Sequence, residues 1–323
     1  MPVITYREAL RQALREEMLR DDSVFILGED IAYYGGSYGV TKGFVDEFGE
    51  KRIKDTPISE TAIIGAATGA AMTGLRPIAE IMSFNFILQA MDQIVNHSAK
   101  IHYMFGGQMQ VPMVIRTPAG WSQLSATHSQ TLEPLFAYIP GLKVVMPSTP
   151  YDAKGLLKAA IRDNDPVLFI EHALIYATKG EVPEEDYVVP IGKSVVRRPG
   201  KDVTIVSFSR MALESVAAAE ELAKEGIDCE IIDLRSLRPL DMGPVLESLK
   251  KTNRVVVAEE GWKSHGIGAE ISSRIMEEGF DYLDAPVKRV AGIEIPDPYN
   301  KHLEYQAFPH KADVIKAVRE VLK

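Results

Sequence analysis

Apolar positions along the chain recur with two different spacings. A spacing of three to four residues is typical of the buried face of a helix, and it predicts helices at 5–20, 60–74, 86–103, 151–162, 211–224, 244–250, 266–278 and 311–322. Short apolar runs without polar alternation predict strands at 24–28, 76–82, 111–116, 143–146, 167–170, 203–206, 229–233 and 254–258. Strands that are apolar on both faces need a covering layer on each side. The order of elements therefore predicts an α/β protein whose parallel sheets are covered by helices.

The alternation of helices and strands is interrupted near the middle of the chain. Residues 180–200 are polar and are punctuated by proline and glycine, which is typical of a linker between domains. The chain has 323 residues, more than one typical domain of roughly 100–200 residues. We therefore expect a first domain over 1–185, a linker over 186–200 and a second domain over 201–323.

Composition and charge exclude several classes of protein. With 46% hydrophobic and 25% charged residues the chain is neither disordered nor fibrous, and its net charge of −9 argues against a nucleic-acid partner. The most apolar stretch, 62–72, is too short to span a membrane. The single cysteine, Cys229, cannot form an internal disulfide, which fits a reducing compartment. The first residues lead into a charged amphipathic pattern, so we expect a cytoplasmic protein or the mature form of an organellar matrix protein.

The start of the helix predicted at 60–74 carries a candidate functional carboxylate. Ser59 is placed to cap this helix, and Glu60 lies in its first turn. Gly65 and Gly69 share one face, and a glycine inside a helix costs about 1 kcal/mol relative to alanine. The two glycines indicate that another backbone packs closely on that face. This segment alone leaves two interpretations of Glu60 open: a helix-start residue favoured by the helix dipole, or a functional carboxylate in an interface crevice.

A histidine in a predicted loop is the second candidate. His128 follows the irregular stretch 118–124, which itself follows the strand predicted at 111–116. Loops after strand ends are where α/β folds place reactive groups, and an imidazole can transfer protons near neutral pH. Most loop histidines are nevertheless ordinary surface residues, so the position alone leaves its role open.

Two glycine-rich runs, at 35–39 and 266–268, could suggest a phosphate-binding loop. Neither is followed by the Gly-Lys-Ser/Thr of a Walker loop, and the second lacks the third glycine of the dinucleotide-binding pattern. We interpret both runs as loops without a bound phosphate.

Motifs spread along the whole chain resemble those of one family. They are Gly28-Glu29-Asp30, Tyr34-Gly35-Gly36, Asp55-Thr56-Pro57-Ile58-Ser59-Glu60, Gly74-Leu75-Arg76-Pro77, Phe84-Asn85-Phe86, Met91-Asp92-Gln93-Ile94, His128-Ser129-Gln130, Pro140-Gly141-Leu142-Lys143, Asp152-Ala153-Lys154-Gly155 and Ile232-Asp233-Leu234-Arg235. Through these motifs the chain resembles the β subunits of the thiamine-diphosphate-dependent decarboxylase component of 2-oxo-acid dehydrogenase complexes.

This resemblance implies a fold and a set of site residues. The fold is a transketolase-like pyrimidine-binding domain followed by a transketolase C-terminal-like domain. Glu60 is implied to bind the N1′ nitrogen of the aminopyrimidine of thiamine diphosphate, where a partly buried, protonated carboxyl would promote proton exchange. Met82, Phe86 and Gln89 match positions that contact the aminopyrimidine ring. His128 is implied to orient a lipoyl group or to supply a proton during its reductive acylation.

The resemblance also implies partners, because half of the cofactor site is missing. The family holds the diphosphate and its magnesium ion with a Gly-Asp-Gly motif, which this sequence lacks. The resemblance therefore implies an α subunit that holds magnesium and diphosphate, a heterotetramer of two α and two β subunits, and a lipoyl acyltransferase core as acceptor. Some relatives bind potassium through main-chain carbonyls, which correspond here to Met113, Ala160, Ile161, Asp163 and Asp165.

Several substrates and one different class of protein remain as alternatives. Among 2-oxo acids, the run Met82-Ser83-Phe84-Asn85-Phe86 resembles the pyruvate members most, whereas Trp121-Ser122-Gln123-Leu124 departs from their glycine- and alanine-rich loop. Branched-chain 2-oxo acids and acetoin therefore remain open. A non-catalytic electron-transfer flavoprotein subunit, or a transketolase-like enzyme split across two genes, would also fit two α/β domains.

Overall fold

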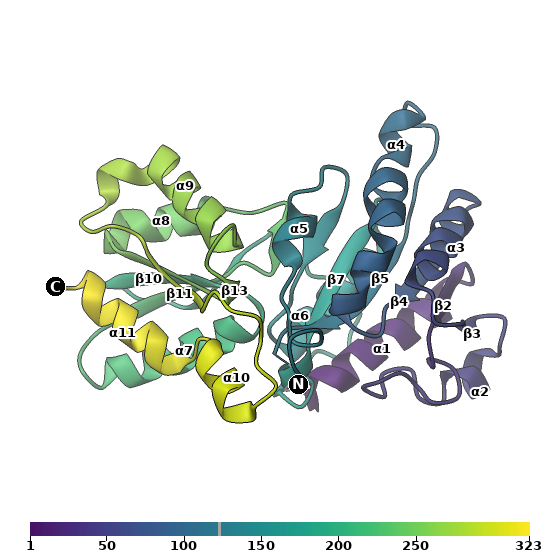
Figure 1. Cartoon of the computed structure of the whole chain (residues 1–323), viewed down its shortest axis with the longest axis horizontal. Coiled ribbons are helices and arrows are strands. Elements are labelled where there is room, and N and C mark those ends of the chain that lie inside the picture. The colour runs from purple at the N-terminus through teal and green to yellow at the C-terminus, as the bar shows by residue number, and fades with distance from the viewer. Residues whose placement is uncertain (122–123) are drawn as a thin grey trace. The chain divides into compact units, whose positions relative to one another are not determined.

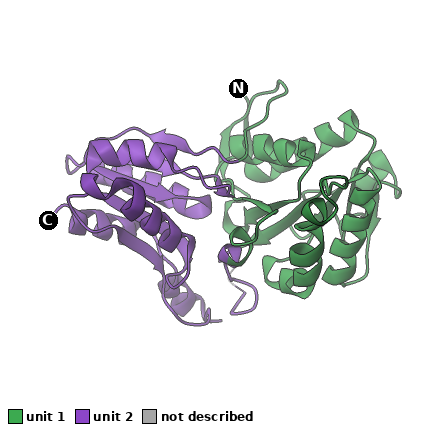
Figure 2. Ribbon diagram, turned by 90° about the horizontal axis from the view of Figure 1, so that it is seen from above, with its two compact units in different colours: residues 1–119, 135–191 green, residues 120–134, 192–323 purple. Residues whose placement is uncertain are grey.

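The computed structural model describes residues 1–121 and 124–323, and these group into two compact units (Figures 1 and 2). Unit 1 comprises Met1–Ala119 and Leu135–Ile191, and unit 2 comprises Gly120–Pro134 and Gly192–Lys323. Within the described residues no helix has both the length and the apolar character needed to cross a membrane. The short segment Gly120–Pro134 lies between the two parts of unit 1 in the sequence but belongs to unit 2, as the colours of Figure 2 show.

The sheet of unit 1 has the strand order β6-β7-β5-β4-β2-β3, and all neighbours in it are parallel. The strands are β2 (Val24–Gly28), β3 (Ile53–Asp55), β4 (Arg76–Glu80), β5 (Val114–Ala119), β6 (Lys143–Val145) and β7 (Val167–His172). A small antiparallel pair, β1 (Val3–Thr5) and β8 (Lys179–Glu181), lies outside this sheet. The expected parallel, doubly covered sheet is confirmed, and every residue of β5 and β7 is buried.

Helices cover both faces of this sheet. The helices of unit 1 include α1 (Tyr6–Arg20), α2 (Phe44–Phe48), α3 (Glu60–Met72), α6 (Pro150–Arg162) and the short η3 (Ala173–Ile175), whereas α5 (Glu133–Ala137) begins in the segment that belongs to unit 2. The connection from β3 through α3 to β4 runs along the sheet in one direction, and that from β6 through α6 to β7 runs in the other. Because such crossovers are right-handed, α3 and α6 lie on opposite faces. α1 packs against α6.

The single helix predicted at 86–103 was wrong. The chain there forms a 3₁₀ helix η1 (Phe84–Ala90), a π-helix η2 (Gln93–Ser98) and a short α4 (Ile101–Met104). The Ser98 hydroxyl contacts both the Gln93 carbonyl and the Thr68 hydroxyl of α3, each at 2.8 Å. This buried contact with α3 accompanies the widened π turn, which apolar spacing alone does not reveal.

Unit 2 has a second sheet with the order β14-β13-β10-β11-β9. Its strands are β9 (Val195–Arg198), β10 (Val203–Ser207), β11 (Cys229–Asp233), β13 (Val255–Trp262) and β14 (Lys288–Gly292); β12 (Ser236–Arg238) lies outside it. Only β9 is antiparallel to its neighbour. The helices are α7 (Ser209–Ala223), α8 (Gly243–Thr252), α9 (Ile267–Gly279), η4 (Phe280–Tyr282), α10 (Lys301–Ala307) and α11 (Lys311–Val321).

The helices of unit 2 form two layers around this sheet. Figure 1 shows α8 and α9 on one face and α7 and α11 on the other. The core between α7, α11 and the sheet includes Ile205, Ile231 and Val256, all fully buried. Cys229 is buried in the same core, and burial raises the pKa of its thiol to about 12. The thiol is therefore part of the packing and not a reactive group.

Candidate active site

The edge of the unit 1 sheet at which the strands end carries the predicted carboxylate. Ser59 caps α3 as predicted, with its Oγ accepting a hydrogen bond from the N–H of Ala62 at 3.4 Å. Glu60 is the first residue of α3 and is half-buried. Because α3 follows β3, Glu60 lies at the carboxyl end of the parallel strands, where α/β sheets place ligands.

A second carboxylate at this edge, Glu29, was given no role by the sequence analysis. It directly follows β2, a central strand of the sheet, and is half-buried. Burial, followed by the charges of Asp30 and Glu60, raises the pKa of Glu29. Its position immediately after a buried central strand was the available signal. A carboxyl group whose pKa is raised by burial and by neighbouring charges is typical of a functional site.

The residues predicted to contact an aminopyrimidine ring lie at the same edge. Met82 comes two residues after the end of β4, whose Glu80 is paired in register with Gly28 of β2. Phe86 and Gln89 lie in η1, and the Thr61 hydroxyl of α3 donates to the Gln89 carbonyl at 2.6 Å. This bond joins the first turn of α3 to η1. Glu60 and Gln89 are thereby brought to neighbouring turns.

A buried ion network links three strands of the unit 1 sheet near this edge. Arg116 of β5 pairs with Glu80 at the end of β4 and with Glu171 of β7, and Tyr176 donates to Glu171. Burial raises the pKa of Glu80, although Arg116 opposes this. Three adjacent strands are therefore tied together by charged hydrogen bonds, and one of the paired residues, Glu80, comes two positions before Met82 in the chain.

The glycine face of α3 remains open within this chain. A Cβ atom on Gly65 would meet only Gln93 Cγ, at 3.6 Å, and one on Gly69 would meet nothing within 4 Å. Ala66 and Gly69 are exposed. The close backbone neighbour that the two glycines predict is thus not found among the described residues of the chain.

His128 belongs to the segment Gly120–Pro134, which is part of unit 2. It is half-buried; its backbone N–H donates to the Ser125 carbonyl at 3.0 Å, and its Nδ1 lies 3.0 Å from the Thr127 hydroxyl. The loop departure noted in the sequence includes Ser122 and Gln123, which lie outside the described residues. Glu60 and His128 thus belong to different units.

Of the carbonyls expected to bind potassium, those of Ala160, Ile161 and Asp163 lie at the C-terminus of α6. Arg76 Nη1 donates to the carbonyls of Ile161 (3.0 Å) and Asp163 (2.7 Å). The carbonyls of Met113 and Ala160 accept backbone hydrogen bonds, and the Asp165 carboxylate pairs with a lysine. A carbonyl oxygen has two lone pairs, and a helix C-terminus favours a cation. These carbonyl oxygens are of a kind that can bind a cation, although the Arg76 guanidinium already supplies one positive charge to two of them.

Metal-binding side chains and a phosphate loop find no support in the part of the chain that is described. It contains no group of three or more His, Cys, Asp or Glu side chains arranged for a metal ion. The run at 266–268 comprises the N-cap Gly266 and the first residues of α9, which confirms the helix predicted at 266–278 and shows that our interpretation of the run as a loop was wrong. The Glu259 carboxylate accepts from the Gly268 N–H at 2.9 Å, so a side chain of the protein occupies that helix terminus.

Comparison with known families identifies both halves of the chain. Residues 3–178 match the transketolase pyrimidine-binding domain family, and residues 192–314 match the transketolase C-terminal domain family. Among solved structures, the chain is similar to a protein described as a split-gene transketolase in an inactive β4 tetramer. The TM-score is 0.79 at 26% identity, over 99% of this chain and 98% of that one. The expected transketolase-like fold class is confirmed.

Curated relatives are similar over nearly the whole chain. A pyruvate dehydrogenase E1 component subunit beta of Rhizobium meliloti is 52% identical over 323 residues, which cover 99% of this chain and 70% of the relative. That of Rickettsia felis is 50% identical and covered to 98% on both sides. The mitochondrial protein of Drosophila melanogaster is 50% identical, over 99% of this chain and 89% of the relative.

Proposed function

The chain belongs to the family of pyruvate dehydrogenase E1 component β subunits, and we propose that it catalyses, with an α subunit, the oxidative decarboxylation of pyruvate and the reductive acylation of lipoyl groups. The observation that carries this proposal is the identity of about 50% to bacterial and mitochondrial members over nearly the full chain. Branched-chain 2-oxo acids and acetoin are the alternative substrates. The identity of about 50% to the pyruvate dehydrogenase relatives, against 26% to the split-gene transketolase, argues against a sugar-phosphate transketolase. The matches of both halves to transketolase domain families argue against the flavoprotein alternative.

The residues at the edge of the unit 1 sheet fit the aminopyrimidine half of thiamine diphosphate. When bound, this cofactor supplies a carbon nucleophile and an electron sink for the loss of carbon dioxide. Glu60 combines a carboxyl group with a helix N-terminus, and Met82 and Phe86 offer a polarisable and a flat apolar surface. We propose that Glu60 exchanges a proton with ring nitrogen N1′, and that Met82, Phe86 and Gln89 hold the ring.

The diphosphate and its magnesium ion are proposed to bind mainly to the α subunit, since the sequence lacks the Gly-Asp-Gly motif. The open glycine face of α3 supports a subunit contact there. We propose an assembly of two α and two β subunits that acylates a lipoyl acyltransferase core, in the cytoplasm or in an organellar matrix. Potassium at the five carbonyls and the domain limits 1–185 and 201–323 also remain proposals.

Substrate assays on the reconstituted protein test this function. The chain is co-expressed with the α subunit of a pyruvate dehydrogenase E1 component, and acceptor reduction is measured with pyruvate, 2-oxoisovalerate and acetoin. We expect the highest kcat/KM with pyruvate. A preference for 2-oxoisovalerate or acetoin would reassign the substrate, and absence of thiamine-diphosphate-dependent turnover with all three would overturn the function.

The proposed role of His128 requires a second assay. We expect His128→Ala to reduce acylation of a lipoyl domain by about 10²-fold, the lower range for loss of a proton-transfer group. Reduction of an artificial electron acceptor, which needs no lipoyl group, should change much less. Equal losses in the two assays would assign His128 to decarboxylation instead.

A further inference from the structure

The segment that carries His128 is attached to unit 2 at both of its ends. At the first end, the Trp121 backbone N–H donates to Glu260 Oε1 at 2.7 Å. The Trp121 ring stacks on Phe308, with ring centroids 5.6 Å apart, and lies 5.6 Å from the Arg210 guanidinium. Arg210 also pairs with Glu260. An aromatic side chain and its own backbone are thus held by the same ion pair.

At the second end, the attachment is a hydrogen bond between two fully buried side chains. The Ser129 hydroxyl donates to Glu304 Oε1 of α10 at 2.9 Å, and both residues have 0% exposure. Two residues later, Thr131 packs so closely on β13 that a Cβ atom on Gly261 would lie 2.6 Å from its hydroxyl. Between the two ends, Leu124 is 55% exposed and Thr127 is exposed.

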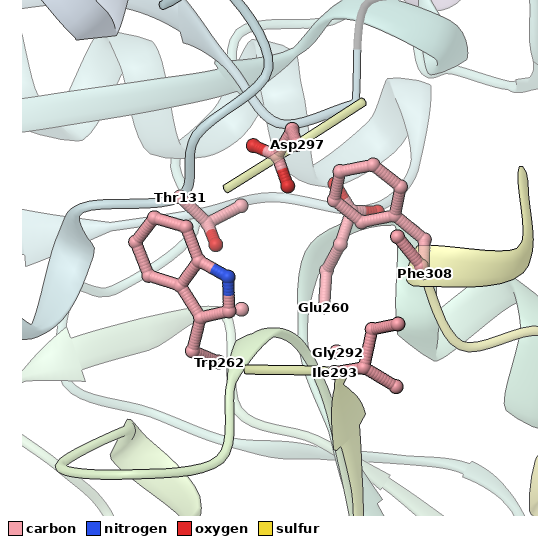
Figure 3. Close-up of a pocket in the computed structure, with 9 residues that line it drawn as sticks. Thr131, Glu260, Trp262, Gly292, Ile293, Asp297 and Phe308 are labelled. Atoms are coloured by element: carbon pink, nitrogen blue, oxygen red, sulfur yellow. The ribbon is translucent and has the colours of Figure 1, made fainter. Parts of the chain in front are cut away.

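The surroundings of this attachment are more polar than packing alone requires. Thr131, Glu260 and Asp297 line a pocket of about 10 Å³, roughly the space of one water molecule (Figure 3). Among the described residues, Asp297 Oδ2 and Glu304 Oε2 have no hydrogen-bond partner. Burial, then Glu260 and Glu304, raises the pKa of Asp297 to about 7. Burying carboxyl groups lowers the stability of the fold, so an apolar contact would hold the segment at a smaller cost in free energy.

From these contacts we infer that Ser129 and Glu304 are positioning residues for His128: their hydrogen bond fixes the end of the segment next to the imidazole, while Trp121 and Glu260 fix the other end. Ser129 is the chain neighbour of His128, so its buried hydroxyl limits the directions in which the imidazole can point. The C-terminal unit thereby orients a residue that lies within the match to the pyrimidine-binding family. The catalytic part of this inference depends on the proposed role of His128.

A double-mutant cycle in the assembled enzyme tests the inference. Ser129→Ala removes the hydroxyl from the segment with little change in volume. We expect about a fivefold loss of kcat/KM for a lipoyl domain, the equivalent of one hydrogen bond, with artificial-acceptor turnover unchanged. In a His128→Ala background, Ser129→Ala should have no further effect, because positioning matters only when the imidazole is present. An equal loss in both backgrounds would overturn the inference.

Variants on the α10 side and a matched control complete the test. Glu304→Gln keeps an oxygen acceptor for Ser129 and should retain most of the lipoyl-dependent activity, whereas Glu304→Ala should reproduce or exceed the loss of Ser129→Ala. Ser272→Ala removes a hydroxyl that donates to the Gly268 carbonyl at 2.7 Å in α9, and it should leave both assays unchanged. Equal losses in the Gln and Ala variants would contradict an acceptor role for Glu304.

Hydrogen exchange separates failure of this inference from failure of the proposed function. Ser129→Ala should accelerate amide exchange in the peptide covering 124–130 without affecting β10 or β11. If His128→Ala leaves lipoyl acylation normal, the role of His128 is wrong, and exchange alone then decides whether Ser129 anchors the segment. Unchanged exchange at 124–130 would overturn the anchoring itself.

Discussion

The two candidate regions of the molecule hold their acidic side chains in opposite ways. At the edge of the unit 1 sheet, Glu29 and Glu60 are half-buried beside an uncovered glycine face. In unit 2, Glu260 and Glu304 are buried and already bind Arg210, Trp121 and Ser129. In our proposal the first region is half of a site that a cofactor and a second subunit complete, whereas the carboxylates of the second region are already paired within the chain. Accessibility of carboxylates, more than their number, thus distinguishes a site of chemistry from its support.

Removing the proton-exchanging group of the open region should have the largest effect. Glu60→Gln preserves size and the helix start but cannot exchange a proton, so we expect pyruvate-dependent turnover to fall by about 10²- to 10⁴-fold. Assembly with the α subunit should remain normal by size-exclusion chromatography. Glu184→Gln, at an exposed position, is the matched control. Turnover within twofold of the wild type would remove Glu60 from its proposed role.

The open glycine face should tolerate a large side chain in the lone chain but not in the assembly. The Cβ atom of Gly69→Leu would meet no atom within 4 Å, and the substitution replaces a helical glycine. The free energy of unfolding of the isolated chain should therefore stay the same or rise by up to about 1 kcal/mol. If the α subunit packs there, co-purification with it should fall at least about tenfold, a modest loss for an interface clash. The control is Ser273→Leu, at an exposed position of α9. Normal assembly of Gly69→Leu would place the α contact elsewhere.

The contrast between the regions also shows what the sequence could reveal. Ser59, Glu60 and the covered parallel strands were predictable because capping and apolar spacing are local properties. The helix α10 was not predictable from the sequence, because only Glu304 and Ala307 in it are buried and no apolar stripe remains to detect. The strand β14 was not predicted either. The attachment of His128 was equally hidden, since the partners of Trp121 and Ser129 lie 139 and 175 residues away.

The buried region should reveal itself through the pH dependence of stability. Burial raises the pKa of Glu133 to about 8, and the charges of Glu259 and Glu260 raise it further. The other charged groups around these carboxylates are Asp297, Glu304, Arg210 and Arg289. Between its ordinary pKa of 4.5 and about 8, the folded protein keeps a proton that the unfolded chain loses. The stabilising contribution is therefore complete below pH 4.5 and is lost as the pH rises to about 8.

Glu133→Gln should remove this loss, because an amide does not ionise. We expect the free energy of unfolding to fall less between pH 5.5 and 8.5 in the variant than in the wild type, by a few kcal/mol at most at about 1.4 kcal/mol per pKa unit. Urea unfolding at both pH values measures the difference, and Glu185→Gln at an exposed position serves as control. Parallel pH profiles for variant and wild type would show that Glu133 ionises normally in the fold.

Potassium should have the smallest effect, since Arg76 already contributes a positive charge to the carbonyls of Ile161 and Asp163. If the remaining lone pairs bind the ion with a Kd about tenfold below a working concentration of about 0.1 M, stabilisation should be about 1.4 kcal/mol. Tm measured in potassium chloride should then exceed that in choline chloride at equal ionic strength. Arg76→Lys keeps the charge but loses the planar guanidinium, whose Nη1 donates to both carbonyls while its Nη2 donates to Asn164 Oδ1, so it should increase the dependence on potassium. Equal Tm values in both salts, for both proteins, would show that this cluster of carbonyls binds no potassium.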